Sequence, residues 1–333
     1  MMASMSRRTR YVALASGGVL AVGLCGGLVA YLNHDAANGA ASDALAELAF
    51  VPPHATALAF ADVRAVMTSE LRERVRRIVP DGVGREQLER QLGLDIERDI
   101  DRVLVFWAPE PDADAGSEDG SSGLALFRGR LDAERLEAVA RRGGAEVTEE
   151  DGLRIVTREV DGAGSLAMAF LEPGLVAVGE PAAVRSAARR GTAEVGIDGD
   201  ADMMRLLGRV DDGSSFWAVG RFGDEGLLGW VPEQVSERLP PVTAFAVQGR
   251  INGGISVSLA VEGRDDAAAQ NLRDVVRGFV ALAQLQTLGN PGLQAILDSL
   301  QTGGDGTAVT LSFRVPAEAI DFLLSMVAPG ENS

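Results

Sequence analysis

Apolar residues along this chain recur with two spacings, at alternate positions and at every third or fourth position, which predict strands and helices respectively. The helical spacing is clear in the series Val63, Met67, Leu71, Val75 and Ile78, which predicts a helix over residues 63–79. A first group of elements occupies residues 43–197. Its strands are predicted at 56–61, 103–107, 124–128, around 155, 167–171 and 175–178, and its helices at 63–79, 85–92, 132–142 and 181–189.

A second group occupies residues 198–329 and repeats the same plan. Its strands are predicted at 215–221, 243–250, 255–261 and 309–315, with an irregular helical stretch after 221, two helices between 266 and 300, and a last helix from 320. Both groups follow the order strand, helix, two strands, helix, strand. We therefore expect an α+β fold with two similar halves, each a mixed or antiparallel sheet backed by helices.

A short sequence echo supports the comparison of the two halves. Residues 129–133 read Gly-Arg-Leu-Asp-Ala and residues 263–267 read Gly-Arg-Asp-Asp-Ala, each between a predicted strand and a predicted helix. An aspartate at this place accepts hydrogen bonds from the unpaired amides of the first helical turn, so Asp132 and Asp266 are predicted helix caps.

The N-terminus has a different character, because an uncharged run covers residues 11–32 behind Arg7, Arg8 and Arg10. A bilayer is crossed by a helix of about 20 apolar residues, and arginines next to such a helix stay cytoplasmic. We predict a cytoplasmic tail over 1–10, a transmembrane anchor or signal segment over 11–32, and a tether over 33–42. This places the chain in the cytoplasmic membrane as a single-pass protein with a periplasmic bulk.

Two other fates of this segment stay open. The small residues over 36–42 permit cleavage, which would make the chain a secreted protein. Cys25 follows a sequence similar to a lipoprotein box, although Leu24 stands where a small residue is usual, and the paired arginines resemble the start of a twin-arginine export signal.

Composition excludes several classes of function. The formal net charge is −17, which disfavours binding to nucleic acid, and Cys25 is the only cysteine, so no disulfide forms within the chain. There is no lysine, which excludes phosphate loops and Schiff-base chemistry that depend on it, and the two histidines are His34 and His54. We read His54 as a surface residue and predict a protein that is not an enzyme and has no cofactor.

The best metal candidate is the acidic loop after residue 109, where Asp112, Asp114 and Glu118 offer oxygen ligands suited to calcium. The loop lacks the glycine and the glutamate of an EF-hand, so a solvated hairpin loop is the alternative. The carboxylates of Asp95, Glu97, Asp99 and Asp101 are interpreted as caps and solvated groups, with paired acids for hydrolysis as the second interpretation.

A candidate interaction segment lies among the glycines and charges after Phe222. Its apolar residues are Leu227, Leu228, Trp230 and Val231. Such residues anchor partners in many interfaces, while packing over the core is the alternative.

Three stretches carry a resemblance to a known class of proteins: residues 51–56 (Val-Pro-Pro-His-Ala-Thr), residues 93–100 (Gly-Leu-Asp-Ile-Glu-Arg-Asp-Ile), and residues 176–179 with 181–184 (Val-Ala-Val-Gly before Pro-Ala-Ala-Val). The chain resembles uncharacterised bacterial envelope proteins with a membrane-anchoring start and a repetitive α+β ectodomain. The resemblance implies architecture and location only. We expect a protein that binds another envelope protein or a lipid, with a carboxylate-dependent hydrolase and a carrier of an apolar ligand as the alternatives.

Overall fold

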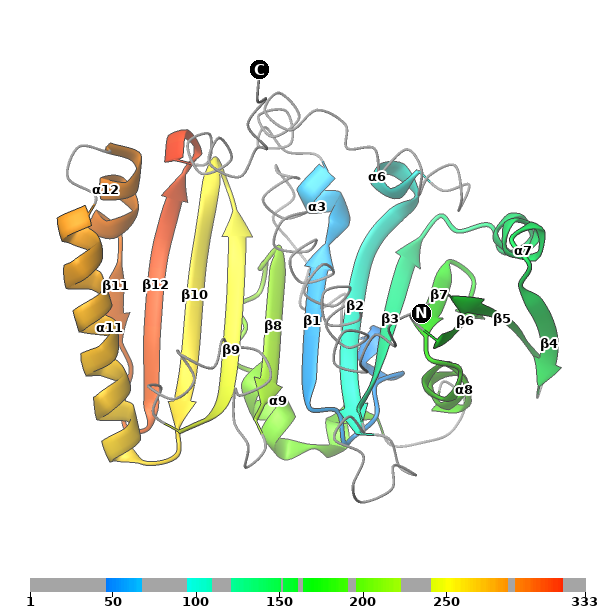
Figure 1. The fold of residues 1–333 in the computed structure, drawn as a ribbon, viewed down its shortest axis with the longest axis horizontal. Coiled ribbons are helices and arrows are strands. Elements are labelled where there is room, and N and C mark those ends of the chain that lie inside the picture. The colour runs from blue at the N-terminus through cyan, green and yellow to red at the C-terminus, as the bar shows by residue number, and fades with distance from the viewer. Residues whose placement is uncertain are drawn as a thin grey trace, which may run out of the picture.

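The computed structural model describes residues 46–67, 95–109, 121–150, 152–160, 164–190, 196–222, 241–286 and 291–319. Its described strands form one antiparallel sheet of 12 strands, with helices on both sides, so the α+β class is confirmed (Figure 1). The strand order is β11-β12-β10-β9-β8-β1-β2-β3-β7-β6-β5-β4.

The part before residue 191 supplies one end of the sheet and the part after 195 supplies the other. The first part contains β1 (Ala57–Asp62), α3 (Val63–Met67), α6 (Ile96–Asp99), β2 (Ile100–Pro109), β3 (Ser121–Gly129), α7 (Ala133–Arg142), β4 (Glu146–Glu150), β5 (Leu153–Val160), β6 (Gly164–Glu172), β7 (Leu175–Gly179) and α8 (Pro181–Arg190). The second contains the turn η1 (Ile197–Gly199), α9 (Ala201–Leu207), β8 (Phe216–Arg221), β9 (Val242–Ile251), β10 (Gly254–Gly263), α11 (Asp266–Gln286), α12 (Pro291–Asp298), β11 (Gln301–Gly303) and β12 (Ala308–Pro316).

The two parts meet where β1 pairs with β8, with Ala59 opposite Ala218 in the middle of the pair. Outward from this pair, β1 is followed by β2, β3 and β7, and β8 is followed by β9, β10 and β12. In the first series β2 and β3, which are consecutive strands of the chain, lie next to β1, and β7 lies beyond β3. In the second series β9 and β10 lie next to β8 in the same way, and β12 lies beyond β10.

The pairing registers of the two series also agree. Gly129, the last residue of β3, pairs with Ile100, the first of β2, and Gly263, the last of β10, pairs with Val242, the first of β9. A register irregularity adjoins the terminal pair in both cases. The amides of the two glycines donate to the carbonyls of Gly174 and Thr307, both at 2.9 Å.

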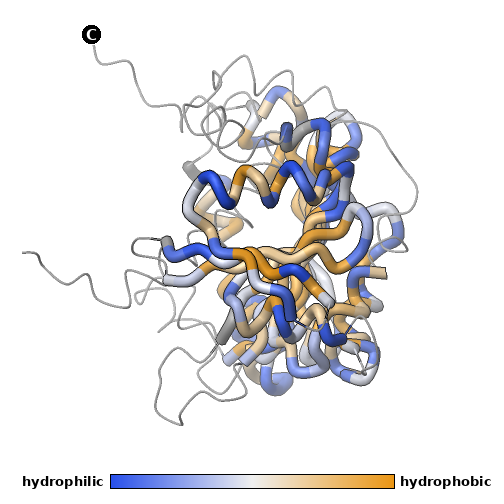
Figure 2. Tube along the Cα trace, turned by 90° about the vertical axis from the view of Figure 1, so that its right-hand side faces the viewer, coloured by the Kyte–Doolittle hydropathy of each residue, from blue (hydrophilic) through white to orange (hydrophobic). Residues whose placement is uncertain are grey.

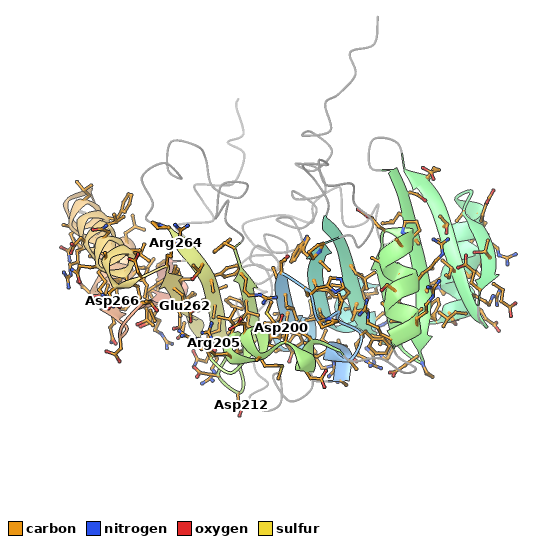
Figure 3. All side chains as sticks on the ribbon, turned by 90° about the horizontal axis from the view of Figure 1, so that it is seen from below. Asp200, Arg205, Asp212, Glu262, Arg264 and Asp266 are labelled. Carbon is orange, nitrogen blue, oxygen red and sulfur yellow. The ribbon has the colours of Figure 1, made fainter. Side chains whose placement is uncertain are left out.

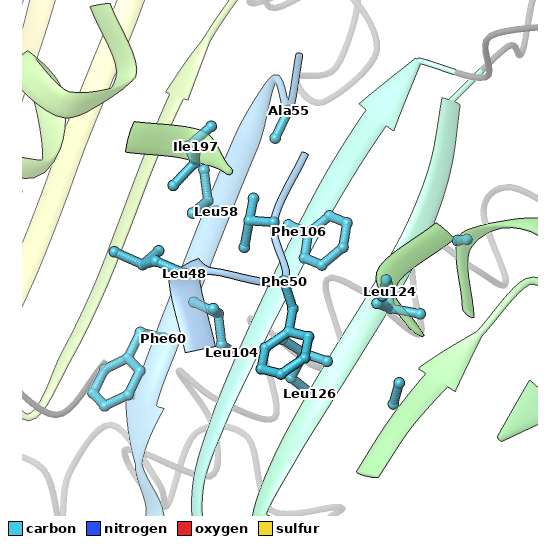
Figure 4. Packing of buried hydrophobic residues seen from close by; sticks show 14 of the residues in the cluster. Leu48, Phe50, Ala55, Leu58, Phe60, Leu104, Phe106, Leu124, Leu126 and Ile197 are labelled. Carbon is cyan, nitrogen blue, oxygen red and sulfur yellow. The ribbon is translucent and has the colours of Figure 1, made fainter. Parts of the chain in front are cut away.

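The main core lies on the side of the sheet that carries α8, α9 and residues 46–55, which we call the α9 side. Apolar residues from β1, β2 and β3 gather there beneath the segment that holds Leu48 and Phe50 (Figure 4). Phe60 stacks on Trp217 across the central pair, with ring centroids 5.5 Å apart. In side view, hydrophobic segments of the trace gather toward its middle and hydrophilic segments toward its outside (Figure 2). This core joins both parts of the chain, because Phe60 and Trp217 come from different parts.

The opposite side, which we call the α11 side, carries α3 and α11. Val66 and Met67 of α3 lie in a smaller cluster with Val103 and Ile251. On α11, Ala269 and Leu272 pack with Val261 and Val309 of β10 and β12. The N-terminal part of α11 therefore holds the outer strands of the second part.

Two glycines on β8 and β9 make room for aromatic rings. A Cβ atom on Gly249 would lie 1.9 Å from the ring of Phe216, and one on Gly220 would lie 2.6 Å from the ring of Phe245. Each ring belongs to the residue paired with that glycine in the neighbouring strand. The missing side chains thus let the two phenylalanines lie flat over the sheet.

The predicted caps are confirmed in one helix and shifted in the other. Asp132 accepts a hydrogen bond from the Arg135 amide at 3.0 Å, as expected. In the second part, the acceptor is Asp265, whose side chain lies 2.8 Å from the Ala268 amide. The prediction of Asp266 as the cap was wrong, because α11 begins three residues after Gly263, whereas α7 begins four residues after Gly129, so the capping position falls one residue earlier.

The short elements α6, β4, η1, α9 and β11 were not predicted. The glycine-rich segment 303–306 forms the turn of the hairpin that connects β11 to β12, with Gly304 and Gly306 at φ 102° and 56°. Within the described ranges, no helix is both long and apolar enough to cross a membrane. The predicted membrane segment at 11–32 lies outside these ranges, as do the helix at 85–92 and the last helix from 320.

Candidate functional site

A buried carboxylate joins the helical turn at 46–48 to the sheet on the α9 side. The side chain of Glu47 is 2% exposed, and its Oε1 accepts hydrogen bonds from Nε of Arg102 at 3.1 Å and Nε of Arg128 at 2.7 Å. Arg102 and Arg128 face each other on β2 and β3. Arg128 also reaches Glu172 at 3.1 Å, and Oε2 of Glu47 is buried without a hydrogen-bond partner among the described residues.

The charges in this cluster stabilise one another. Burial of the Arg128 guanidinium disfavours its charge, but hydrogen bonds and attraction from Glu47 and Glu172 outweigh burial, so the pKa of Arg128 is raised. Asp62, opposite Arg102 on β1, has a raised pKa because burial outweighs its hydrogen bond from Ala65 and the attraction of Arg102. The cluster fastens the helical turn at 46–48 to the sheet.

A second ionic cluster lies on the same side, between α9 and β10. Arg205 contacts both carboxylate oxygens of Glu262, and Figure 3 labels these two residues. Arg209 contacts Oε1 of the same carboxylate. Burial alone would raise the pKa of Glu262, but the hydrogen bond and attraction of Arg205 and the charge of Arg209 lower it. The contact fixes α9 to β10. In the chain α9 comes just before β8, and β10 is the third strand of the series that starts with β8.

The two clusters occupy matching places with reversed charges. In the first, a glutamate before β1 binds an arginine on β3; in the second, an arginine before β8 binds a glutamate on β10. Asp200, the cap of α9, also binds Arg221 at the end of β8, at 2.7 Å. These contacts explain why helical segments lie across the ends of the strands.

The carboxylate run near α6 also has structural roles. Asp95 accepts a hydrogen bond from the Arg98 amide at 3.2 Å, Asp99 accepts one from the Asp95 amide at 3.0 Å, and Asp101 pairs with Arg64. The interpretation of Asp95 as a cap is confirmed. These carboxylates bind amides or arginine, which leaves them poorly suited to act as paired acids in hydrolysis.

His54 is exposed, as predicted, in the turn before β1. Its pKa is lowered, first by partial burial and second by the positive charge of Arg190. A group of three or more side chains able to hold a metal ion is not found among the described residues. The calcium candidates Asp112, Asp114 and Glu118 lie outside them.

The most distinctive surface is on the α11 side of β9, β10 and β12, and we call it the apolar face. Paired residues of neighbouring strands share one side of a sheet, and Val261 and Val309, which contact α11, mark that side. Along these strands this side carries only apolar residues and glycine. Gly249 and Ile251 at the end of β9 are buried, Ile251 in the cluster of α3. The half-buried members are Phe245, Val247, Ile255, Val257, Leu259, Leu311, Phe313 and Val315. No charged residue interrupts this set.

The other side of β10 and β12 has the opposite character. There Ser256 and Ser258 alternate with the apolar residues of β10, and Thr310 and Ser312 do so on β12. Strands with one apolar and one polar side normally bury the apolar side. An apolar side that is only half-buried is therefore the feature of the described residues best suited to bind something.

The interaction candidates Leu227, Leu228, Trp230 and Val231 lie outside the described residues, as do the topology residues Arg7, Arg8 and Arg10. The residue before that segment is informative, because Phe222 stacks on Phe245 of the apolar face with ring centroids 5.2 Å apart. Sequence reasoning missed the apolar face itself. The signal was present as alternating apolar residues in three strands, but their neighbours in the sheet were unknown.

Comparisons with protein-family models, with curated proteins and with solved structures find no match for this chain.

Proposed function

We propose that this protein is a membrane-anchored extracytoplasmic protein without catalytic activity, which binds another envelope component through the apolar face. The observation that carries the proposal is the uninterrupted set of half-buried apolar residues on β9, β10 and β12. Contiguous apolar surface of this kind is typical of interaction sites.

The ionic contacts support a binding role over an enzymatic one. Glu47, Glu262 and Asp200 are each held by arginine, and Asp62 caps α3 through the Ala65 amide at 2.7 Å. General acid catalysis needs a carboxyl group with a raised pKa in a cleft, and the role of Asp62 as a cap explains its burial without catalysis. The carboxylate-dependent hydrolase remains the weaker alternative.

The proposed architecture is an N-terminal transmembrane helix over 11–32 followed by two similar halves, with domains over 43–197 and 198–329. The matching registers, the irregularities beside Gly129 and Gly263, and the paired ionic clusters support a duplication. Under this proposal both domains contribute to a single sheet. Location in the cytoplasmic membrane rests on the arginines and the uncharged run alone.

The function is tested by native mass spectrometry of the full-length protein, extracted gently from its own membranes. Retained protein or lipid mass identifies the bound component. Leu259→Asn on the apolar face is expected to remove it, and Ser258→Asn, one residue away on the polar side of β10, is the matched control. Retention of the same mass by both variants, or its absence from the unaltered protein, contradicts the proposal.

A second candidate, carriage of an apolar molecule, is favoured by the same surface, because its described positions hold no charge. The mass measured above separates the two, since a carrier retains a small apolar molecule and a scaffold retains a polypeptide. Substitution of Trp230 and Leu228 by serine tests the neighbouring segment in the same experiment.

A further inference from the structure

The two longest uncharged runs of this sequence lie at residues 11–32 and 278–297. The second is unusual in a chain with 24% charged residues. It starts where the charges of α11 end, after Arg277, and it includes all of α12 except Asp298. The end of α11 and α12 therefore form a helical pair that carries no charge before that aspartate.

This pair also exposes large apolar side chains. Phe279 is 63% exposed and Leu282 is 58% exposed, and the only other exposed large apolar residue among those described is Leu166 at 41%. Phe279 and Leu282 lie three residues apart on α11, so both project from neighbouring positions of one helix. The packing of α11 on the sheet involves Ala269 and Leu272 near its start. The helix is thus anchored at one end and exposes apolar residues at the other.

The chemistry of this surface selects its partner. A stable complex between proteins buries about 800 Å² on each partner and usually has a polar rim. Two exposed apolar side chains fall short of such an area, which disfavours a second copy of this chain. A lipid bilayer needs no matching shape, and apolar side chains that project from one face of a helix enter the boundary between its headgroups and acyl chains.

We propose that the α11–α12 pair inserts Phe279 and Leu282 into the surface of a lipid bilayer. The two helices lie at the interface and do not cross it, because α11 ends at Gln286 and α12 begins at Pro291. The contact fixes the end of the sheet that carries β11 against the membrane. The inference rests on the proposed location beside a membrane, and its test measures the contact at position 282 separately from the N-terminal anchor.

The test uses the full chain with Cys25→Ser and Leu282→Cys, labelled at position 282 with a polarity-sensitive fluorophore. The protein is placed in phosphatidylcholine vesicles that contain lipid with a nitroxide in its acyl chain. We expect quenching several times stronger than for Leu166→Cys, the matched exposed apolar position. Adding Phe279→Ser is expected to reduce quenching at position 282.

Equal quenching at positions 282 and 166 overturns the inference. A label at position 282 that is shielded without quenching also overturns it, and then crosslinking between two copies, or a copurified polypeptide, identifies the occupant. Failure of the anchor is measured separately, as release of the chain from its native membranes by alkaline carbonate. A released chain that is still quenched at position 282 refutes the anchor and supports the inference.

Discussion

Removing the buried carboxylate of Glu47 is expected to destabilise the whole sheet. Glu47→Ala leaves two guanidiniums, those of Arg102 and Arg128, each about one fifth exposed, without the carboxylate between them. Breaking a buried ion pair by removing one partner costs about 3–5 kcal/mol. Because Arg128 keeps Glu172 at 3.1 Å, we expect the lower end, about 3 kcal/mol.

The assay is unfolding in urea, followed by circular dichroism of the full chain in mild detergent. With a slope of about 3 kcal/mol per molar urea, a loss of about 3 kcal/mol lowers the midpoint by about 1 M. Glu134→Ala is the matched control, since Glu134 is an exposed glutamate on α7. It is expected to lower the midpoint by less than about 0.3 M, within the range of surface substitutions.

A third variant tests the electrostatic part of the reasoning. Replacing Glu47, Arg102 and Arg128 together by Leu, Met and Met removes the charges and keeps most of the volume, and such replacements are often close to neutral. We expect it to be more stable than Glu47→Ala. If Glu47→Ala behaves like Glu134→Ala, the cluster does not hold the helical turn to the sheet and the reasoning is refuted.

Three further outcomes are expected. Asp265→Ala should cost about 1 kcal/mol in urea unfolding and Asp266→Ala much less, since the side chain of Asp265 is the cap of α11; the reverse order would mean that the cap is Asp266. The pKa of Glu262 is below its ordinary value of 4.5, so its stabilising contribution is complete above about pH 4.5 and disappears as pH falls through the lower folded value. Unfolding measured against pH should therefore show Glu262→Gln converging with the unaltered protein in acid, and a constant difference would contradict this. Gly249→Ala should cost about 1–3 kcal/mol in thermal or urea unfolding because the Phe216 ring must move, and an unchanged midpoint would show that it moves freely.

Local sequence patterns were sufficient for the elements with strong signals. Short continuous apolar runs predicted β2 and β3. Asp132 predicted the start of α7, because a capping side chain acts within three residues. The strand β4 was missed because its sequence Glu-Val-Thr-Glu-Glu has little apolar alternation, which is usual at a sheet edge. The three residues of β11 were too few to form a pattern.

Contacts between distant residues were not predictable in this way. Glu47 lies 55 residues from Arg102 and 81 from Arg128, and no local spacing links them. The pairing of β1 with β8 likewise depends on the whole sheet. The apolar face was missed for the same reason. The alternating apolar residues of each strand could be read from the sequence, but the strand pairing that places them on one side of the sheet could not.

The position of β1 in the middle of the sheet affects how the chain folds as it emerges. One edge of β1 pairs with β2, which follows soon after, but the other edge pairs with β8, which is synthesised much later. Until β8 arrives, the earlier part has a bare strand edge with unpaired backbone groups, a surface prone to pair with other chains. Contacts between residues so far apart also make folding slow. A nascent chain of this protein therefore needs protection on that edge until its second part has emerged.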